Sequence, residues 1–245
     1  MTETTMEVRI ALRIPGNWAD PGELLERIPE GYQLTPEALI LPDGQEVEFF
    51  AMPPDDQFAG IFRSSLRRPA LAEELQVVDQ YTVNVGLAGP GGSMESARAM
   101  MQAAGAILRA GGGGVFIDNS GLSHGADNWL FMTDEGSSDA VSFAFVGIVR
   151  GQHDVWTMGM QVPGFPEVVM RRADADADDR AIIEMICYLC SNERPVGDGH
   201  IIADENGPRF RAQLEADEQF EPDSPMHNPF GRLRLVSMKD AAERN

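Results

Sequence analysis

Lysine, cysteine and long apolar runs are what this sequence has least of. Only one of its 19 basic residues, Lys239, is a lysine, a bias that we attribute to base composition. Its two cysteines are too few for a disulfide framework. No apolar stretch approaches the ~20 residues that a membrane-spanning helix needs. Residues 1–14 are polar and lack the apolar core of a secretory signal. We therefore expect a cytoplasmic protein with no membrane partner.

Acidic residues outnumber basic residues by two to one. The chain carries 39 Asp and Glu against 19 Lys and Arg, which gives a formal charge of −20 with histidine neutral. A field of this sign repels nucleic acid and anionic lipid, so both are poor partners. The simplest interpretation is solubility, and the second is attraction to a basic protein partner. The sequence does not indicate an oligomeric state.

The remaining composition is that of an ordinary globular protein. Hydrophobic residues make up 43% of the 245 positions and charged residues 24%. A chain of this length can bury a core without disulfides or metal ions. Neither a repeat of fixed period nor a linker-like segment divides it, so we expect a single compact domain over residues 1–245.

Strand and helix patterns alternate irregularly along the chain. Strands are expected over residues 8–14, 38–41, 47–50, 81–87, 115–117, 141–150, 154–162, 167–170, 201–203, 210–214 and 233–238. Short helices are expected over residues 22–27, 55–66 and 128–132, and two main helices over 94–109 and 180–190. Residues 215–229 read as a long surface loop. The predicted fold class is α+β, a mixed β-sheet with the two main helices packed on it.

Three short motifs resemble cofactor or metal sites, but each lacks a feature that such a site requires. Cys187 and Cys190 form a CxxC pair, but the pair lies at the far end of a helix among apolar residues, which favours core thiols. The acidic run 174–179 begins like a calcium loop, but Asp179 and Met185 stand where Gly and Glu are needed, so helix capping explains it better. The Gly-rich turn 89–93 fits neither phosphate-binding motif. We expect no cofactor and no metal.

The stretch 118–125 carries the most chemistry. It places Asp118, Ser123 and His124 just past a short apolar strand that we expect to be buried on both faces. It lacks the GxSxG pattern of a nucleophile elbow. Two interpretations stay open. In the first, this is a polar loop in which Asp118 caps backbone N–H groups. In the second, the loop folds back and brings Ser123 and His124 close to Asp118. Glu167 and Asp198 are further catalytic candidates.

Several weak motifs recur in an order known from one bacterial family. They are Met52-Pro53-Pro54 before an aromatic helix, the strand 81–87 before an alanine-rich helix, the strand 114–117, residues 157–160 leading to Pro166-Glu167, and Gly197-Asp198-Gly199-His200 after a helix. In this order, over roughly residues 45–203, they resemble the uncharacterised domain of unknown function 4261. His200 departs from the family's pattern, which tends to have a small polar or acidic residue there. The resemblance implies an α+β fold and no established reaction.

Two functional hypotheses of different classes follow. The first is a non-catalytic interaction protein, immunity- or adaptor-like, that binds a basic protein partner through its acidic surface. The second is a hydrolase of unrecognised type that uses Asp118 and His124, with Glu167 or Asp198. The missing catalytic motifs favour the first.

Overall fold

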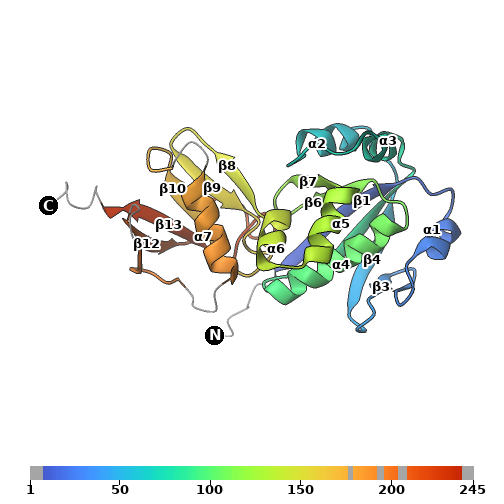
Figure 1. Ribbon diagram of the computed structural model, residues 1–245, viewed down its shortest axis with the longest axis horizontal. Coiled ribbons are helices and arrows are strands. Elements are labelled where there is room, and N and C mark those ends of the chain that lie inside the picture. Colours follow the sequence, from blue (N-terminus) through green and yellow to red (C-terminus); the bar gives the residue numbers. More distant parts are fainter. Residues whose placement is uncertain (1–7, 176–178, 192–195, 204–208, 239–245) are drawn as a thin grey trace.

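The computed structural model describes residues 8–175, 179–191, 196–203 and 209–238, and its strands form two separate sheets (Figure 1). The first sheet has the order β2-β3-β4-β5-β1-β6-β7, with all neighbours antiparallel. Its strands are β1 (Arg9–Gly16), β2 (Gln33–Leu34), β3 (Ala38–Ile40), β4 (Glu46–Met52), β5 (Val83–Pro90), β6 (Gly114–Ile117) and β7 (Leu122–Gly125).

The second sheet has the order β11-β12-β13-β10-β9-β8. Its strands are β8 (Gly147–Arg150), β9 (Asp154–Met158), β10 (Glu167–Arg171), β11 (Ile201–Ala203), β12 (Arg209–Glu215) and β13 (Arg232–Ser237). Only β10 and β13 run parallel, so this sheet is mixed. The helices are α1 (Pro21–Arg27), α2 (Phe58–Ser64), α3 (Ala72–Gln80), α4 (Met94–Arg109), α5 (Ala126–Glu135), α6 (Ser138–Phe145) and α7 (Arg180–Ser191). The α+β class is confirmed.

Helices cover both faces of the first sheet (Figure 1). Helix α4 begins where Ser93 Oγ accepts the N–H of Ser96, and its apolar stripe joins Ile10, Leu12 and Ile14 of β1 in the main core. Helices α2 and α3 cover the opposite face with a smaller cluster of rings that includes Phe116. The short strand β6 is therefore buried on both faces, as its uninterrupted apolar residues predict.

The second sheet has a core of its own. Helix α7 lays Ile182, Ile186 and Leu189 against residues such as Val168 and Leu233. The two main helices therefore pack on different sheets, and the expected single sheet is wrong. A sheet rarely exceeds ~10 strands, and the choice of pairing partners depends on contacts remote in sequence, so strand patterns alone do not reveal the division. Helix α6 contacts α7 and joins the two cores.

Residues 141–145 are helical, which corrects the expected strand over 141–150. Ser137 Oγ accepts the N–H of Ala140 and so caps α6. The buried residues Val141, Ala144 and Phe145 then fall at helical spacing on the core. Only residues 147–150 remain as strand β8, and β9 ends at residue 158 rather than at 162.

Three elements were not expected at all, and the short strand β2 is one of them. Helix α3 follows the predicted helix α2, and strand β7 replaces the second half of the expected polar loop. Residues 216–231, by contrast, contain neither helix nor strand, as expected for the long loop. No helix among the described residues is long and apolar enough to cross a membrane.

Candidate functional site

Asp118 lies directly after β6 and pairs with β1. Its carboxylate accepts a hydrogen bond from Arg13 Nε at 3.0 Å, and its backbone N–H donates to Ala11 O. The loop after it turns at Gly121, whose φ of +66° favours glycine. Because of that turn, the chain returns at once along β6 as strand β7.

His124 is a core residue and lies away from Asp118. The hairpin register places His124 opposite Val115, whereas Asp118 follows Ile117 at the other end of β6. The ring is fully buried, with Nε2 2.9 Å from Ala144 O and Nδ1 3.3 Å from Asn128 Nδ2. Nε2 therefore carries the proton and Nδ1 accepts. Burial, aided by the nearby Arg67 and Arg68, lowers the pKa of His124 to about 4, although the hydrogen bond to Ala144 O acts in the opposite direction.

Ser123 is equally buried and already has its partner. Its Oγ donates to Phe62 O at 2.5 Å. The structure thus gives neither the polar loop nor the folded-back site that the sequence left open. Asp118, Ser123 and His124 are held in three separate hydrogen-bonded settings, and a hydrolase built on Asp118 and His124 lacks the contact between acid and base that it requires.

Glu167 is the most thoroughly bonded carboxylate of the candidates. It is fully buried at the start of β10; Oε2 accepts from Thr157 Oγ1 at 2.6 Å, and Oε1 accepts from the N–H groups of Gly159 and Met160 and from Asn228 Nδ2. Burial raises the pKa of this carboxyl, and the four donors act against that rise. The arrangement ties the end of β9 and the loop before β13 to β10, so Glu167 holds the fold together.

Asp198 and the two cysteines differ in their exposure to solvent. Asp198 is exposed, and its carboxylate accepts the N–H of Leu214. Cys190 is buried, which raises the pKa of its thiol to about 12, while Cys187 is half-buried. Asp176 and Asp178 of the acidic run lie outside the described residues. Within the part of the chain that the structure describes, no three His, Cys, Asp or Glu side chains are placed to hold a metal ion.

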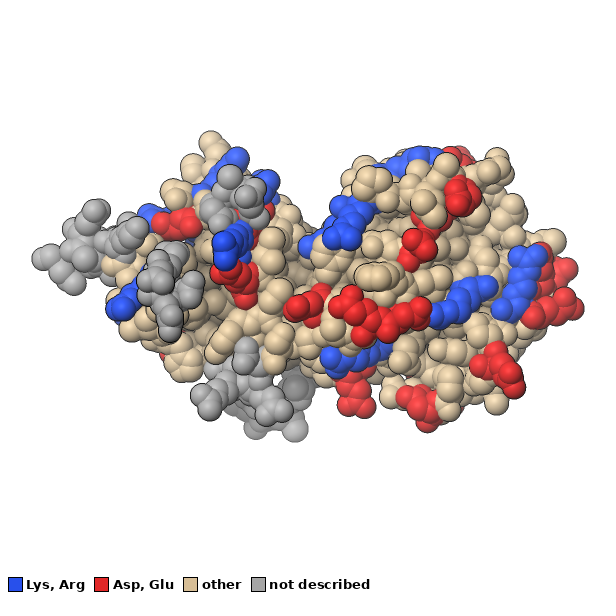
Figure 2. Space-filling model, in the orientation of Figure 1, with Lys and Arg blue, Asp and Glu red and all other residues tan. Residues whose placement is uncertain are grey.

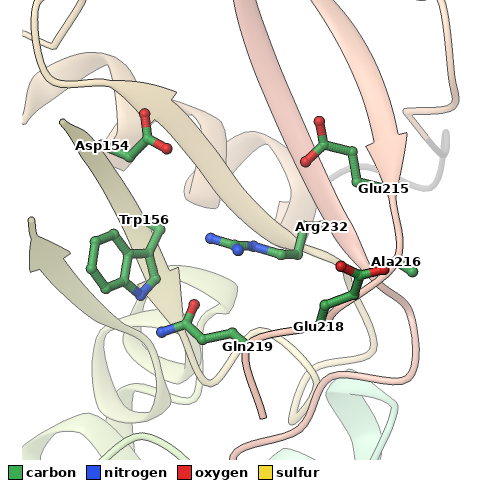
Figure 3. A pocket seen from close by; sticks show the side chains of 7 residues that line it. All are labelled: Asp154, Trp156, Glu215, Ala216, Glu218, Gln219 and Arg232. Carbon is green, nitrogen blue, oxygen red and sulfur yellow. The ribbon is translucent and has the colours of Figure 1, made fainter.

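The second sheet carries an open cleft of about 570 Å³ (Figure 3). Its lining residues are Asp154, Trp156, Glu215, Ala216, Glu218, Gln219 and Arg232. The Trp156 indole forms one wall, and the Arg232 guanidinium reaches toward it across the cleft. The Trp156 Nε1 atom is buried and has no hydrogen-bond partner among the described residues.

The charges in this cleft are nearly balanced. Arg234 of β13 pairs with Asp154 at 3.2 Å and with Glu215 at 3.0 Å. The two remaining charged residues of the lining, Glu218 and Arg232, have opposite signs. The cleft therefore does not concentrate the negative charge of the molecule.

A second, apolar opening lies at the edge of the first sheet. It measures about 340 Å³ and lies between α1 and strands β2, β4 and β5. We call it the α1 groove; its lining residues are Trp18, Asp20, Leu24, Leu25, Leu34, Thr35, Pro36, Phe49, Ala51 and Val83. Trp18 forms its floor, being almost fully buried with Nε1 donating to Ala110 O at 2.8 Å.

Negative charge is concentrated in the segment that builds this groove. We call residues 20–56 the acidic strip, because they carry ten carboxylates and one arginine, Arg27, for a net charge of −9. That is about three times the charge density of the whole chain. Nine of the ten residues are exposed; the set is Asp20, Glu23, Glu26, Glu30, Glu37, Asp43, Glu46, Glu48, Asp55 and Asp56, with Glu23 half-buried.

On the face shown in Figure 2, acidic side chains gather around the α1 end of the molecule, at the right of the view, with basic ones beside them. A second group of acidic side chains lies near the middle of this face. Counting charges by segment would have located the strip from the sequence, whereas the total of −20 conceals it. The groove beside it could not be predicted from the sequence, because its lining residues Trp18, Phe49 and Val83 are far apart in the chain.

No protein-family model, curated protein or solved structure matches this chain. The resemblance to domain of unknown function 4261 therefore stays a prediction.

Proposed function

We propose that this chain is a cytoplasmic, non-catalytic interaction protein, immunity- or adaptor-like, that binds a basic protein partner through the acidic strip. The observation that carries the proposal is the density of that strip, ten carboxylates against Arg27 within a 37-residue segment that includes the strands β2, β3 and β4 at one edge of the first sheet. The scattered settings of Asp118, Ser123 and His124 support a binding role over a catalytic one.

The strip has carboxylates available to a partner. Glu26, Glu30 and Glu37 are exposed, and their carboxylates make no hydrogen bond or ion pair within the described residues. A basic partner meeting them gains many weak attractions, each worth up to ~1 kcal/mol at an exposed surface. Such attractions accelerate association and weaken as salt shortens the Debye length from ~30 Å at 0.01 M to ~8 Å at 0.15 M.

The test measures binding of a labelled twelve-residue peptide of alternating arginine and serine by fluorescence anisotropy. The triple variant Glu26→Gln, Glu30→Gln, Glu37→Gln should weaken binding about tenfold at 20 mM salt, since three weak pairs together amount to ~1.4 kcal/mol. Raising the salt to 300 mM should remove most of the difference.

A matched variant separates the strip from net charge alone. This variant carries Glu73→Gln, Glu218→Gln and Glu221→Gln. It also removes three negative charges, but from exposed positions outside the strip, and Glu218 belongs to the cleft in Figure 3. This variant should weaken binding by less than threefold. Equal losses in the two triple variants would show that the peptide responds only to total charge, and the strip would lose its role.

A further inference from the structure

The α1 groove is a part of the main core that the helices leave open. Leu34, Phe49 and Val83 are packed against the main core but only partly buried. Helix α1 spans seven residues, about 10 Å at 1.5 Å per residue, and so covers only part of the sheet beneath it. Its Leu25 is 51% exposed. Apolar surface therefore stays in contact with water at a place where it is already shaped into a hollow.

Acidic residues line this apolar hollow or adjoin its lining residues in the chain. Asp20 is one of the lining residues, Glu23 and Glu26 flank the lining leucines of α1, and Glu37 follows the lining residue Pro36. An apolar floor with an acidic rim complements a chain segment in which one large apolar side chain is flanked by arginine or lysine. Charge and shape thus point to the same occupant.

We infer that the α1 groove is the anchor site for one large apolar side chain of the basic partner protein, with the flanking basic residues of that partner lying on the acidic rim. This inference rests on the proposed function, and it adds the recognition element that charge alone does not supply. At about 340 Å³ the groove lies near the lower end of the ~300–1,000 Å³ range of ligand sites. It has room for one large side chain rather than for a helix.

A buried aromatic anchor in a pre-formed hollow, surrounded by contacts that exclude water, is the usual form of a binding hot spot. Here the hollow is pre-formed because Trp18 is fixed at its floor. A Cβ at Gly16 would lie 2.1 Å from the Trp18 ring, so the indole packs directly on the strand backbone. The acidic rim would then speed the association with the basic partner, and the groove would determine which partner binds.

The experiment compares two labelled peptides that differ at one position. Both are twelve-residue arginine–serine peptides; one carries tryptophan at its centre and the other serine. The tryptophan peptide should bind at least tenfold more tightly at 150 mM salt. The triple strip variant should weaken both peptides by the same factor, because both carry the same charges.

Filling the groove should remove only the tryptophan's advantage. Ala51 is exposed and lines the groove, so Ala51→Phe places a ring in the hollow. This variant should bind both peptides with the affinity that the native protein has for the serine peptide. Gln33→Phe adds the same ring at an exposed position of β2 outside the lining, and it should keep the tenfold preference.

The outcomes distinguish the two ideas. Equal binding of the two peptides to the native protein, with both weakened by the strip variant, would overturn the groove inference and leave the proposed function standing. Binding of either peptide that ignores the strip variant would overturn the proposed function. Binding of N-acetyltryptophanamide as tight as that of the tryptophan peptide, and insensitive to salt, would make the groove a small-molecule site and would also overturn the inference.

Discussion

Several buried polar side chains of this protein hold parts of the fold together. Glu167 receives four donors, and His124 bridges β7 to α6 through Ala144 O. Leaving such a group without its partners costs ~1–3 kcal/mol, more for a charge. These residue types belong equally to catalytic sites, so the sequence marked them as candidates, and only their partners show that they hold the structure.

His124 should make the stability depend on pH in a narrow window. Its folded pKa of about 4 lies below the ordinary 6.5, so the unfolded chain takes up the proton first as the pH falls. The stability that the neutral ring contributes is present above pH 6.5 and is lost between pH 6.5 and 4. Between pH 7.5 and 4.5 this loss is ~2–3 kcal/mol. Urea unfolding at both values measures it.

The comparison variant is His124→Gln, whose amide can still donate to Ala144 O. It should be less stable than the native protein at pH 7.5 and should lose less stability on acidification, because glutamine does not titrate. If the free energies of unfolding of both proteins fall equally between the two pH values, His124 is not a buried neutral ring.

At the scale of elements, the sequence predicted a helix correctly where the residues that stabilise it lie in the helix itself. Residues 94–109 carry a cap at Ser93 and apolar residues at helical spacing, and both act within the helix. Residues 141–145 are mostly apolar, a pattern that strand and helix share, and the cap at Ser137 was the decisive signal. Strand β7 could not be seen, because the buried setting of Ser123 and His124 is created by α2 and α6.

One buried carboxylate holds the starts of two helices. Glu74 Oε2 accepts the N–H of Leu71 at 2.7 Å before α3, and Oε1 accepts the N–H of Asp127 at 2.6 Å in the first turn of α5. Glu74→Ala leaves both N–H groups without this acceptor and should cost ~2–4 kcal/mol, whereas Glu74→Gln keeps one good acceptor and should cost ~1–2 kcal/mol.

Glu73 supplies the control for Glu74, since it is the neighbouring residue on α3 and is exposed. Glu73→Gln should change the free energy of unfolding by less than ~0.5 kcal/mol, as surface substitutions usually do. Chemical unfolding followed by far-ultraviolet circular dichroism measures all three variants. A Glu74→Ala protein as stable as the native one would mean that water replaces the carboxylate at both helix starts.

The whole molecule consists of two sheets with separate cores, joined by α6 and by a few hydrogen bonds. Asn119 is central among these bonds: its Oδ1 accepts the N–H of Ala11, and its Nδ2 donates to Arg9 O and Pro225 O at 2.9 Å each. Pro225 O also accepts a hydrogen bond from Gln161 Nε2. The long loop before β13 is thereby fastened to β1, which no pattern in the sequence indicates.

The expectation of a single domain over residues 1–245 can be tested at this fastening. Asn119→Ala removes three hydrogen bonds, a loss of ~2–4 kcal/mol, and the bond to Pro225 O is the one of the three that crosses between the halves. If that contact couples the two cores, the native protein should unfold in one calorimetric transition. The variant should then unfold in two, with a van't Hoff enthalpy well below the calorimetric one. Asn17→Ala, an exposed asparagine, should keep the single transition. A lower melting temperature in Asn119→Ala with the two enthalpies still equal would show that the remaining contacts, α6 and the Gly92–Val162 hydrogen bond among them, keep the halves one cooperative unit.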